Sequence, residues 1–599
     1  MASGGESLSL FPFWRDLLDY QLGGFRRDLV AAISVALLAL PQSVAYAFVA
    51  GLPPSAGVFS AIFGTIFIAA FGSSRRLVAG PTNAIAILIQ SGTAEIIYTS
   101  YPNLTGPKKD LFAQEIVLIL CLMVGCFQIL AAVLKAGRIT QFASRSVVVG
   151  YLSVVALTIL ITQCYPFFGI RSDPGHHPLI QRCLFLISNL SLLNIPTTLI
   201  AVGSLIFLIG FKKLIPKWPY AVVIFILAGW VVLFFNLSPE TAAGSFDVEA
   251  GEPVERVTLL GDVGPLFTGF PSLDFPSFNW SLLGNLIPLA FAITLLSVLE
   301  ATAIGRNYHK ASDPPYSSNQ EVLGLGIGNL LSSFLGAMPS SGSFSRTALN
   351  VSLRAGSRFA AVLSGMILLI FSLLFGFLVA KIPLGTIAAL MMLVAFEMIN
   401  FKNLLFCLRA TRIDSLVVIF TFASGLFFNL DIALYIGVIL SIVLYLRQAA
   451  TPLLVEYSFN NIGKLRPIEQ EDERLDPRIC IVQAEGELFF GAADILEMKL
   501  RELSEGESIR IIIFQLFNTR SVDASICLVL KKLHRYMRSE GKVLLASGVN
   551  KEVWKVMRSA GLIGEMGEER FFKTNEQLPS EPTRSAYAFA KTLIELDHT

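Results

Sequence analysis

Two segments in the apolar part of the chain combine glycine with proline or small polar residues just before a short apolar stretch. They are AGPTNAIAILI, from Ala79, and SGSFSRTALNVSL, from Ser341. Each pattern predicts a break in a helix followed by a short helix. If the two helix N-termini meet inside a membrane, their free N–H groups and dipoles favour an anion there. Lipid cannot satisfy a broken backbone, so we expect both breaks to line a cavity.

Arg346 lies one turn into the second of these short helices. An arginine at that depth costs roughly 2.5–3.5 kcal/mol. We therefore expect its side chain to face the cavity, where a fixed cation suits an anionic ligand. The alternatives are a kinked structural helix at each break, and an arginine at the end of an interfacial helix.

Glu300 lies past the centre of the apolar run IPLAFAITLLSVLEATAIGRN. A carboxylate within a spanning helix indicates a proton or cation site. The alternative is a helix-end carboxylate paired with Arg306. Ile304 and Gly305 continue the apolar pattern beyond Glu300 and argue against that alternative.

The first long apolar run contains the sequence LALPQSVAYAFVAGLPP. Pro41 interrupts helical hydrogen bonding and leaves carbonyl groups free. Gln42 and Tyr46 are four residues apart, so they share one helix face, and both can hydrogen-bond a ligand. Alternatively, Tyr46 is a packing aromatic.

The composition defines the elements that must position these residues. The chain has 599 residues, of which 54% are hydrophobic and 15% are charged, whereas charged residues reach about 25% in soluble domains. A mean hydropathy of +0.65 agrees with a membrane protein. A net charge of +2 argues against nucleic-acid binding. No CxxC pair is present, and the His176–His177 pair is expected to be a polar loop, so we expect neither a metal site nor an enzyme.

Apolar runs long enough to span a bilayer, or nearly so, predict fourteen spans. These spans begin near Asp28, Gly57, Thr82, Leu111, Ser144, Pro196, Pro219, Leu282, Glu321, Ser345, Phe359, Leu384, Ile413 and Asp431. Lys and Arg are concentrated in alternate loops, which places both termini in the cytoplasm. The two breaks open the third and tenth spans, as expected for two sets of seven. Because seven is odd, the second set is inverted relative to the first.

The charge pattern also predicts domain boundaries. Residues 1–27 form a cytoplasmic or interfacial segment, 28–450 the membrane domain, and 451–599 a linker, a charged domain with its core at about 475–575, and a C-terminal tail. In that core strand-like and amphipathic segments alternate, which predicts an α/β layer structure. Asp523 or Ser525 lies where it can cap a helix that follows a strand. No Walker-type glycine loop supports nucleotide binding.

These motifs together resemble the SulP sulfate permease and anion transporter family. The resemblance rests on LALPQSVAYAFVAGLPPSAGVFSAIFG, FGSSRRLVAGPTNAIAIL and LEATAIGRNYHKASDPPYSSNQEVLGLGIGNLLSSFLGAMPSSGSFSRTALN, and on the C-terminal domain; it extends from about residue 12 to 575. It implies fourteen spans as two inverted sevens, divided into a core and a gate bundle, and a cytoplasmic STAS domain. It also implies a homodimer and an elevator-like motion of the core.

Carried over by motif, the resemblance implies an anion site formed by Gln42, Tyr46, Thr82, Ser345 and Arg346. Glu300 occupies the family's acidic position and is expected to couple a proton. The sodium-coupled bicarbonate branch usually has a hydroxyl four residues after this acid. Here that position is Ile304, with Thr302 nearby. Ser525 matches the serine that is phosphorylated in related soluble anti-anti-sigma proteins, although it can equally be only a cap.

We therefore expect a proton-coupled sulfate symporter in a plasma membrane or bacterial inner membrane. It needs no cofactor besides the coupling proton, and the STAS domain binds regulatory partners. The alternatives are a sodium-coupled bicarbonate or dicarboxylate transporter, or an anion exchanger. A remote alternative is a membrane sensor that signals through the STAS domain, which leaves Glu300 and Arg346 without a role.

Overall fold

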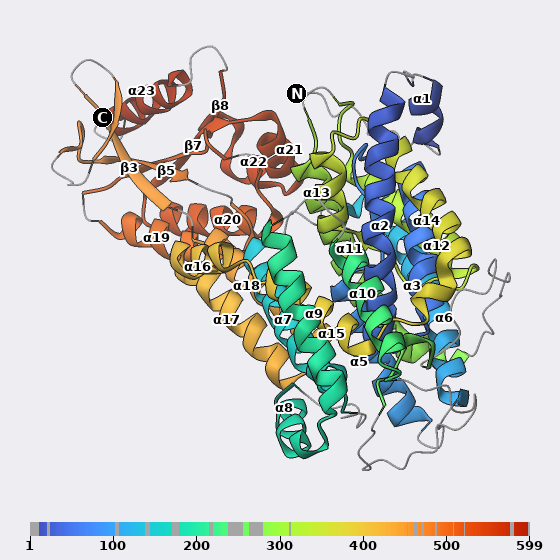
Figure 1. Cartoon of the computed structure of the whole chain (residues 1–599). Coiled ribbons are helices and arrows are strands. Elements are labelled where there is room, and N and C mark those ends of the chain that lie inside the picture. Colours follow the sequence, from blue (N-terminus) through green and yellow to red (C-terminus); the bar gives the residue numbers. More distant parts are fainter. Residues whose placement is uncertain are drawn as a thin grey trace. The chain divides into compact units, whose positions relative to one another are not determined.

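The computed structural model divides the chain into two compact units, Met1–Ser441 and Ile442–Thr599. Figure 1 shows their helices and strands in chain order. Each unit is described by itself. The structure describes residues 11–18, 20, 24–101, 107–137, 144–170, 179–214, 220–237, 256–262, 280–310, 313–451, 453–460, 464–468, 473–485, 488–506, 508–519, 521–575 and 580–596.

Each of the fourteen predicted spans is helical in the first unit. The helices of the first seven spans, with two short helices outside them, are α1 (Pro12–Leu18), α2 (Phe25–Val49), α3 (Pro54–Phe59), α4 (Thr65–Phe71), α5 (Asn83–Ser100), α6 (Pro107–Val133), α7 (Arg145–Phe168), α8 (Leu179–Ser188), α9 (Ile195–Leu214) and α10 (Tyr220–Phe234). A π-helical turn, Ser60–Gly64, joins α3 to α4 within the second span.

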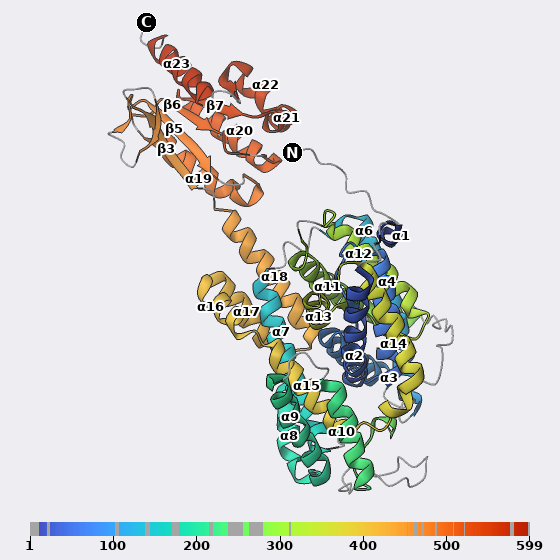
Figure 2. The same cartoon turned by 45° about the horizontal axis from the view of Figure 1, so that its top comes forward.

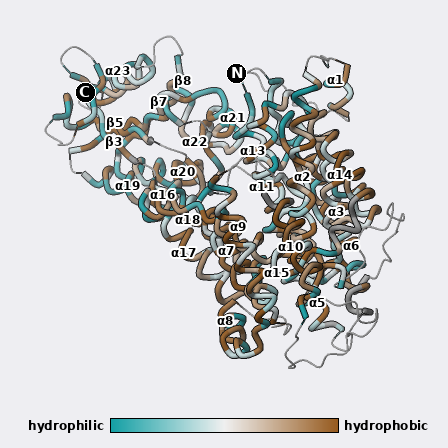
Figure 3. Tube along the Cα trace, viewed as in Figure 1, coloured by the Kyte–Doolittle hydropathy of each residue, from teal (hydrophilic) through white to brown (hydrophobic). Residues whose placement is uncertain are grey.

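The second set of spans begins at α11. Its helices are α11 (Trp280–Asn307), α12 (Ser318–Ser333), α13 (Phe344–Ser352), α14 (Arg358–Val379), α15 (Leu384–Met398), α16 (Phe401–Ala410), α17 (Arg412–Phe427) and α18 (Leu430–Ala449). Eight helical segments in the described part of the chain are long and apolar enough to cross a membrane alone. Figure 3 shows the strongly hydrophobic character of these helices.

The helices of the first unit form two groups by their contacts. In the first group, α12 packs on α4 and α6, α14 packs on α2 and α4, and α11 packs on α6. The half-helices α13 and α5 also belong to this group, because α13 packs on α2 and α5 packs on α11. In the second group, α7 packs on α15 and α17, and α9 packs on α15. Figure 2 shows the two groups from a second direction. Both breaks lie in the first group, since β1 (Ala79–Gly80) contacts α4 and β2 (Ser341–Gly342) contacts α11.

The second unit contains a six-stranded mixed sheet. Its strands are β3 (Leu453–Phe459), β4 (Leu465–Pro467), β5 (Ile479–Glu485), β6 (Ile511–Gln515), β7 (Val543–Val549) and β8 (Phe571–Lys573), in the order β4-β3-β5-β6-β7-β8. Strands β5 to β8 are parallel, whereas β3 is antiparallel to both of its neighbours.

Helices cover both faces of this sheet. One apolar core lies between the sheet and α19 (Ala493–Glu505), α20 (Ala524–Ser539), α21 (Lys551–Ser559) and α22 (Leu562–Met566). The other lies beneath α23 (Glu581–Leu596). The predicted α/β layers are present, and β3, β4 and α23 lie outside the predicted core of about 475–575.

Candidate functional site

The two helix breaks pair with each other. Strand β1 (Ala79–Gly80) lies antiparallel to β2 (Ser341–Gly342), with Gly80 opposite Ser341. Helix α5 begins three residues after β1, and α13 begins two residues after β2. Each helix exposes first-turn N–H groups that have no partner inside the helix. The pairing thus brings together the starts of two helices that are far apart in the sequence.

Arg346 lies beside the place where β1 and β2 pair, which we call the crossing, and its side chain is buried. The residue is 1% exposed, and Nη2 donates a hydrogen bond to the Pro81 carbonyl oxygen at 2.5 Å. Its Nε and Nη1 atoms have no hydrogen-bond partner within the described residues. Arg346 is therefore not the exposed end of an interfacial helix, and it holds unused donors that an anion can accept from.

Gly80 makes room for the Arg346 side chain. A Cβ atom on Gly80 would lie 2.5 Å from Arg346 Nη1. Gly80 also has a φ of +133°, which residues with a side chain rarely adopt. Glycine is therefore required here by both the backbone and the neighbouring guanidinium.

Glu300, on α11, approaches the same crossing from another helix. The residue is 8% exposed, and the Thr82 hydroxyl donates to its Oε2 at 3.4 Å. Arg306 instead donates to the Ser318 hydroxyl at 2.8 Å. The helix-end ion pair considered from the sequence is thus absent from this part of the structure. Arg346 and Glu300 contact the consecutive residues Pro81 and Thr82.

The predicted residues on α2 are also buried. Gln42 and Tyr46 are each 5% exposed, one turn apart on the helix that contains Pro41. The Oε1 atom of Gln42 has no hydrogen-bond partner in the described structure. Tyr46 lies close enough to interact electrostatically with Arg346. The α2 face therefore adjoins the cationic side of the crossing.

Ser345 is placed differently from the other predicted ligands. It lies at the start of α13, as expected, but its side chain is exposed and its hydroxyl is 3.4 Å from that of Ser343. The Ser343 hydroxyl caps the helix by accepting from Arg346 N. Ser345 is thus at the predicted end of α13 without direct contact to the buried guanidinium.

Asn83 was not singled out from the sequence. It is 4% exposed at the first position of α5, its Oδ1 has no partner in the described residues, and its Nδ2 contacts Met398 Sδ at 3.4 Å. The sequence signal that could have identified Asn83 was its position after Pro81 and Thr82, at the break where α5 begins. A buried amide with an unused acceptor at this helix start can contribute to ligand recognition.

Ion pairs at one end of the helices join the loop before the first break to α1 and to the segment before α12, and join α1 to the start of α14. Asp16 binds Arg75 at 2.5 Å and Arg358 at 2.7 Å, and Arg76 pairs with Asp313. Burial alone would raise the pKa of the Asp313 carboxyl, but the hydrogen bond and charge of Arg76 hold it below its usual range. These contacts join segments that the sequence predicts on one side of the membrane.

In the second unit, Asp523 rather than Ser525 caps α20. Asp523 Oδ1 accepts from Ile526 N at 3.0 Å, and its Oδ2 accepts from Phe490 N at 2.6 Å. Ser525 lies in the first turn of α20 and is half-buried. The possibility that Ser525 is only a cap is therefore wrong, while its phosphorylation remains a prediction.

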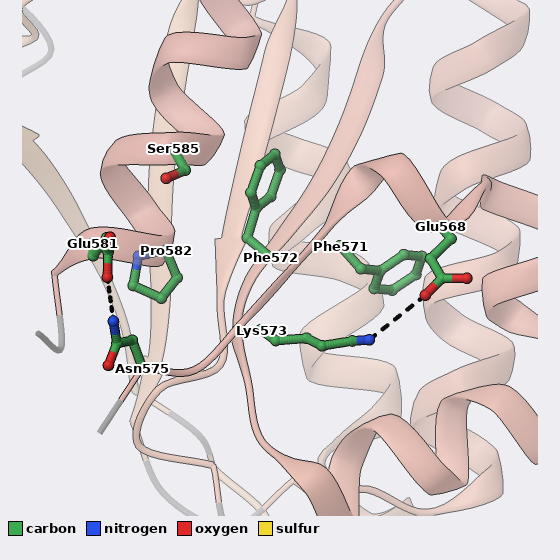
Figure 4. A pocket seen from close by; sticks show the side chains of 8 residues that line it. All are labelled: Glu568, Phe571, Phe572, Lys573, Asn575, Glu581, Pro582 and Ser585. Atoms are coloured by element: carbon green, nitrogen blue, oxygen red, sulfur yellow. Dashed lines mark hydrogen bonds and ion pairs between the residues drawn. The ribbon is translucent and has the colours of Figure 1, made fainter. Parts of the chain in front are cut away.

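A pocket of about 400 Å³ lies between β8 and the start of α23 (Figure 4). Lys573 pairs there with Glu568 at 3.5 Å, and its Nζ lies 3.9 Å from the centre of the Trp554 ring. None of the predicted site residues lines this pocket. Among the described residues no cluster could hold a metal ion, and His176 and His177 lie outside them.

The fold and the paired half-helices define a polytopic transporter rather than an enzyme. Residues 25–421 match the Sulfate permease family, and residues 472–578 match the STAS domain. The chain belongs to the sulfate permease family, and it is an anion transporter with a C-terminal STAS domain. The resemblance recognised from the sequence is therefore confirmed.

Relatives match along nearly the whole chain. YvdB of Bacillus subtilis is 27% identical over 93% of this chain and 98% of its own length. Sulfate transporter 4.1, chloroplastic, of Arabidopsis thaliana is 25% identical over 94% of this chain and 81% of its own length. The structure of murine Slc26a9 covers 97% of this chain and 94% of its own, at 19% identity and a TM-score of 0.84. The predicted fold class, a polytopic helical membrane protein with an α/β STAS domain, is confirmed.

Proposed function

We propose that this chain is a proton-coupled sulfate symporter. The observation that carries the proposal is the meeting of two half-helix N-termini beside the buried Arg346, whose Nε and Nη1 have no partner in the described residues. Sulfate is the anion that the curated relatives' names give. Its oxygens accept hydrogen bonds from both a guanidinium and helix N–H groups.

Sulfate binds between the α2 face and the crossing. Arg346 supplies the fixed charge and a two-point hydrogen bond, and Tyr46 and the Gln42 amide supply further hydrogen bonds. Thr82 and Ser345 complete the polar ends of the two half-helices. The unused donors of Arg346 support this arrangement, because a buried donor without a partner costs free energy unless a ligand satisfies it.

Glu300 carries the coupling proton. A sulfate dianion near Arg346 offsets the cationic field around Glu300, so binding of the anion favours binding of a proton to the carboxylate. One charge interaction at about 5 Å and an effective dielectric constant of about 20 amounts to about 3 kcal/mol. The effect is reciprocal: protonation of Glu300 strengthens sulfate binding by the same amount.

The surroundings of Glu300 favour a proton over sodium. Ile304, four residues after the acid, is an apolar residue with no exposed surface. The Thr302 hydroxyl donates to the Val298 carbonyl oxygen of its own helix at 2.7 Å. A sodium site needs several oxygen ligands, and Ile304 supplies none at the position where the sodium-coupled branch usually has a hydroxyl.

Transport follows an elevator-like motion of the first helix group against the second. Both half-helices, Arg346 and Glu300 belong to elements of the first group, so anion and proton move together. In this proposal both termini lie in the cytoplasm of a plasma membrane or bacterial inner membrane. The protein is a homodimer whose STAS domains bind regulatory partners.

Uptake of radiolabelled sulfate into liposomes that contain the full chain tests the function. An inward proton gradient should drive accumulation of sulfate above equilibrium, and an inward sodium gradient at equal pH should not. Empty liposomes and an Arg346→Ala variant are the controls. Accumulation that requires sodium, or that occurs with bicarbonate but not sulfate, contradicts the proposal.

A further inference from the structure

Four buried polar residues form a hydrogen-bonded chain beside the crossing strands. They are Gln128 on α6, Ser297 on α11, Asn329 on α12 and Ser340 just before β2, all 0% exposed, and we call them the amide network. None of them belongs to the anion site described above.

Asn329 binds the backbone of Ser340 at two points. Its Oδ1 accepts from Ser340 N at 2.7 Å, and its Nδ2 donates to Ser340 O at 3.1 Å. These are the two bonds that a neighbouring strand would make with that residue. The Ser340 hydroxyl is also paired, at 2.7 Å, with that of Ser60. The residue directly before β2 is therefore fixed by its backbone and by its side chain.

Gln128 connects this anchor to the helix that carries Glu300. Its Oε1 accepts from Asn329 Nδ2 at 2.9 Å, and its Nε2 donates to the Ser297 hydroxyl at 2.6 Å. Ser297 lies three residues before Glu300, and its carbonyl oxygen accepts from the Ser341 hydroxyl at 3.1 Å. The network thus joins the β2 region to α11 in two ways: directly, from the Ser341 hydroxyl to Ser297 O, and indirectly, from Ser340 through Asn329 and Gln128 to the Ser297 hydroxyl.

Two glycines allow the amides to meet. A Cβ atom on Gly125 of α6 would lie 2.6 Å from Leu330 N and 2.9 Å from the Gly326 carbonyl oxygen. The backbones of α6 and α12 therefore approach more closely than side chains would permit. Gln128 and Asn329 each lie three residues after the glycine of their own helix, within hydrogen-bond reach of each other.

We propose that Gln128 and Asn329 are positioning residues of the anion site, an inference that rests on the proposed function. The network fixes the start of β2, and through it the start of α13 with Arg346, relative to Glu300 on α11. Loss of a hydrogen bond made by either side-chain amide leaves buried polar groups unpaired, which favours displacement of β2. A displacement of about 1 Å can change function by up to about a hundredfold.

Full-length variants reconstituted in liposomes test this inference. Asn329→Asp keeps the acceptor for Ser340 N and removes both Nδ2 bonds, and Gln128→Met removes both Gln128 bonds without adding charge. Ser333→Ala is the matched control, because Ser333 is buried on α12 and its hydroxyl donates to its own helix at Leu330 O. We expect sulfate Kd and transport KM to rise between about tenfold and about a hundredfold in both network variants.

Thermal unfolding and an Arg346→Ala variant, measured in parallel, separate the possible outcomes. If both network variants unfold at lower temperature but keep wild-type Kd and KM, the network is only structural and the inference is overturned. Wild-type Kd and KM with unchanged unfolding overturn it as well, even where Arg346→Ala abolishes binding. Wild-type binding by Arg346→Ala would instead remove the proposed site itself.

Discussion

Arg346 Nη2 donates to the carbonyl oxygen of Pro81 at 2.5 Å, which ties the cation of one half-helix to the break that precedes the other. The next residue, Thr82, donates to Glu300 at 3.4 Å. No ion pair joins Arg346 to Glu300 among the described residues. Arg346 and Glu300 therefore contact consecutive residues of the first break without pairing with each other in the described structure.

Replacement of Arg346 should remove sulfate binding. In Arg346→Ala the site loses its buried cation and two unused donors, and we expect no saturable binding in calorimetry. Arg346→Lys should restore part of the affinity, because a lysine keeps the charge without the two-point geometry. Arg409→Ala, at an exposed position on α16, is the control and should bind normally. Normal affinity in the Arg346→Ala variant would contradict the site.

A methyl group at Gly80 should reduce sulfate affinity by displacing the Arg346 guanidinium. Gly51→Ala provides the matched control: Gly51 also has a positive φ, of +71°, but a Cβ there meets nothing within 4 Å. Gly51→Ala should lose about 1–2 kcal/mol of stability from backbone strain, and Gly80→Ala about 1–3 kcal/mol, because its φ of +133° lies in a region that only glycine readily adopts. Only Gly80→Ala should show a raised sulfate Kd. Equal Kd values in the two variants would show that displacement of the guanidinium is not the cause.

The Arg76–Asp313 pair should stabilise the folded protein in a pH-dependent way. Because the pKa of Asp313 is lowered in the folded state, its contribution is present above the unfolded pKa of about 3.9 and is lost as pH falls through the lower folded value. Asp313→Asn should destabilise the protein by about 3 kcal/mol at neutral pH, since it leaves Arg76 buried without its charge partner.

Unfolding of the wild type and Asp313→Asn across pH checks this prediction. The difference in stability should shrink as pH falls below about 4, where the unfolded carboxylate begins to bind a proton, and vanish below the lower pKa of the folded carboxylate. A constant difference between neutral and acid pH would show that the pair does not act through its charge.

The cap of α20 gives a prediction for the STAS domain. Asp523→Ala removes the bonds to Ile526 N and Phe490 N and should cost about 1–2 kcal/mol. Ser525→Ala should cost less than about 0.5 kcal/mol, since Ser525 is not the cap. Thermal unfolding of the two full-length variants compares them. The reverse order of stabilities would contradict this assignment.

The half-helix breaks were predictable because glycine and small polar residues within apolar runs are strong local signals. Arg346 was predictable because an unpaired charge in an apolar segment requires a partner or a cavity. The direction of the Ser345 side chain was not, because it depends on the rotation of α13 about its axis. The amide network was also missed, since single residues such as Gln128 and Asn329 in apolar helices create no periodic pattern.

In the second unit, the alternation of apolar and amphipathic segments predicted β5, β6 and β7 with the helices between them. Strands β3 and β4 were missed because they follow the last apolar helix and form one antiparallel edge. Helix α23 was placed in a tail, although its face with Ala586, Ala590 and Ile594 is buried on the sheet. The small residues on that face give little hydrophobic contrast in the sequence.

Proton coupling in this transporter depends on Glu300, which we propose binds the proton that moves with sulfate. The most direct test is sulfate affinity measured from about pH 5 to about pH 8 in wild type and Glu300→Gln, whose amide mimics the protonated acid. Wild-type affinity should rise at acid pH, by up to roughly a hundredfold for a coupling of about 3 kcal/mol. Glu300→Gln should bind sulfate tightly at every pH and fail to accumulate it against a gradient. If Glu300→Gln keeps the full pH dependence, Glu300 is not the proton site.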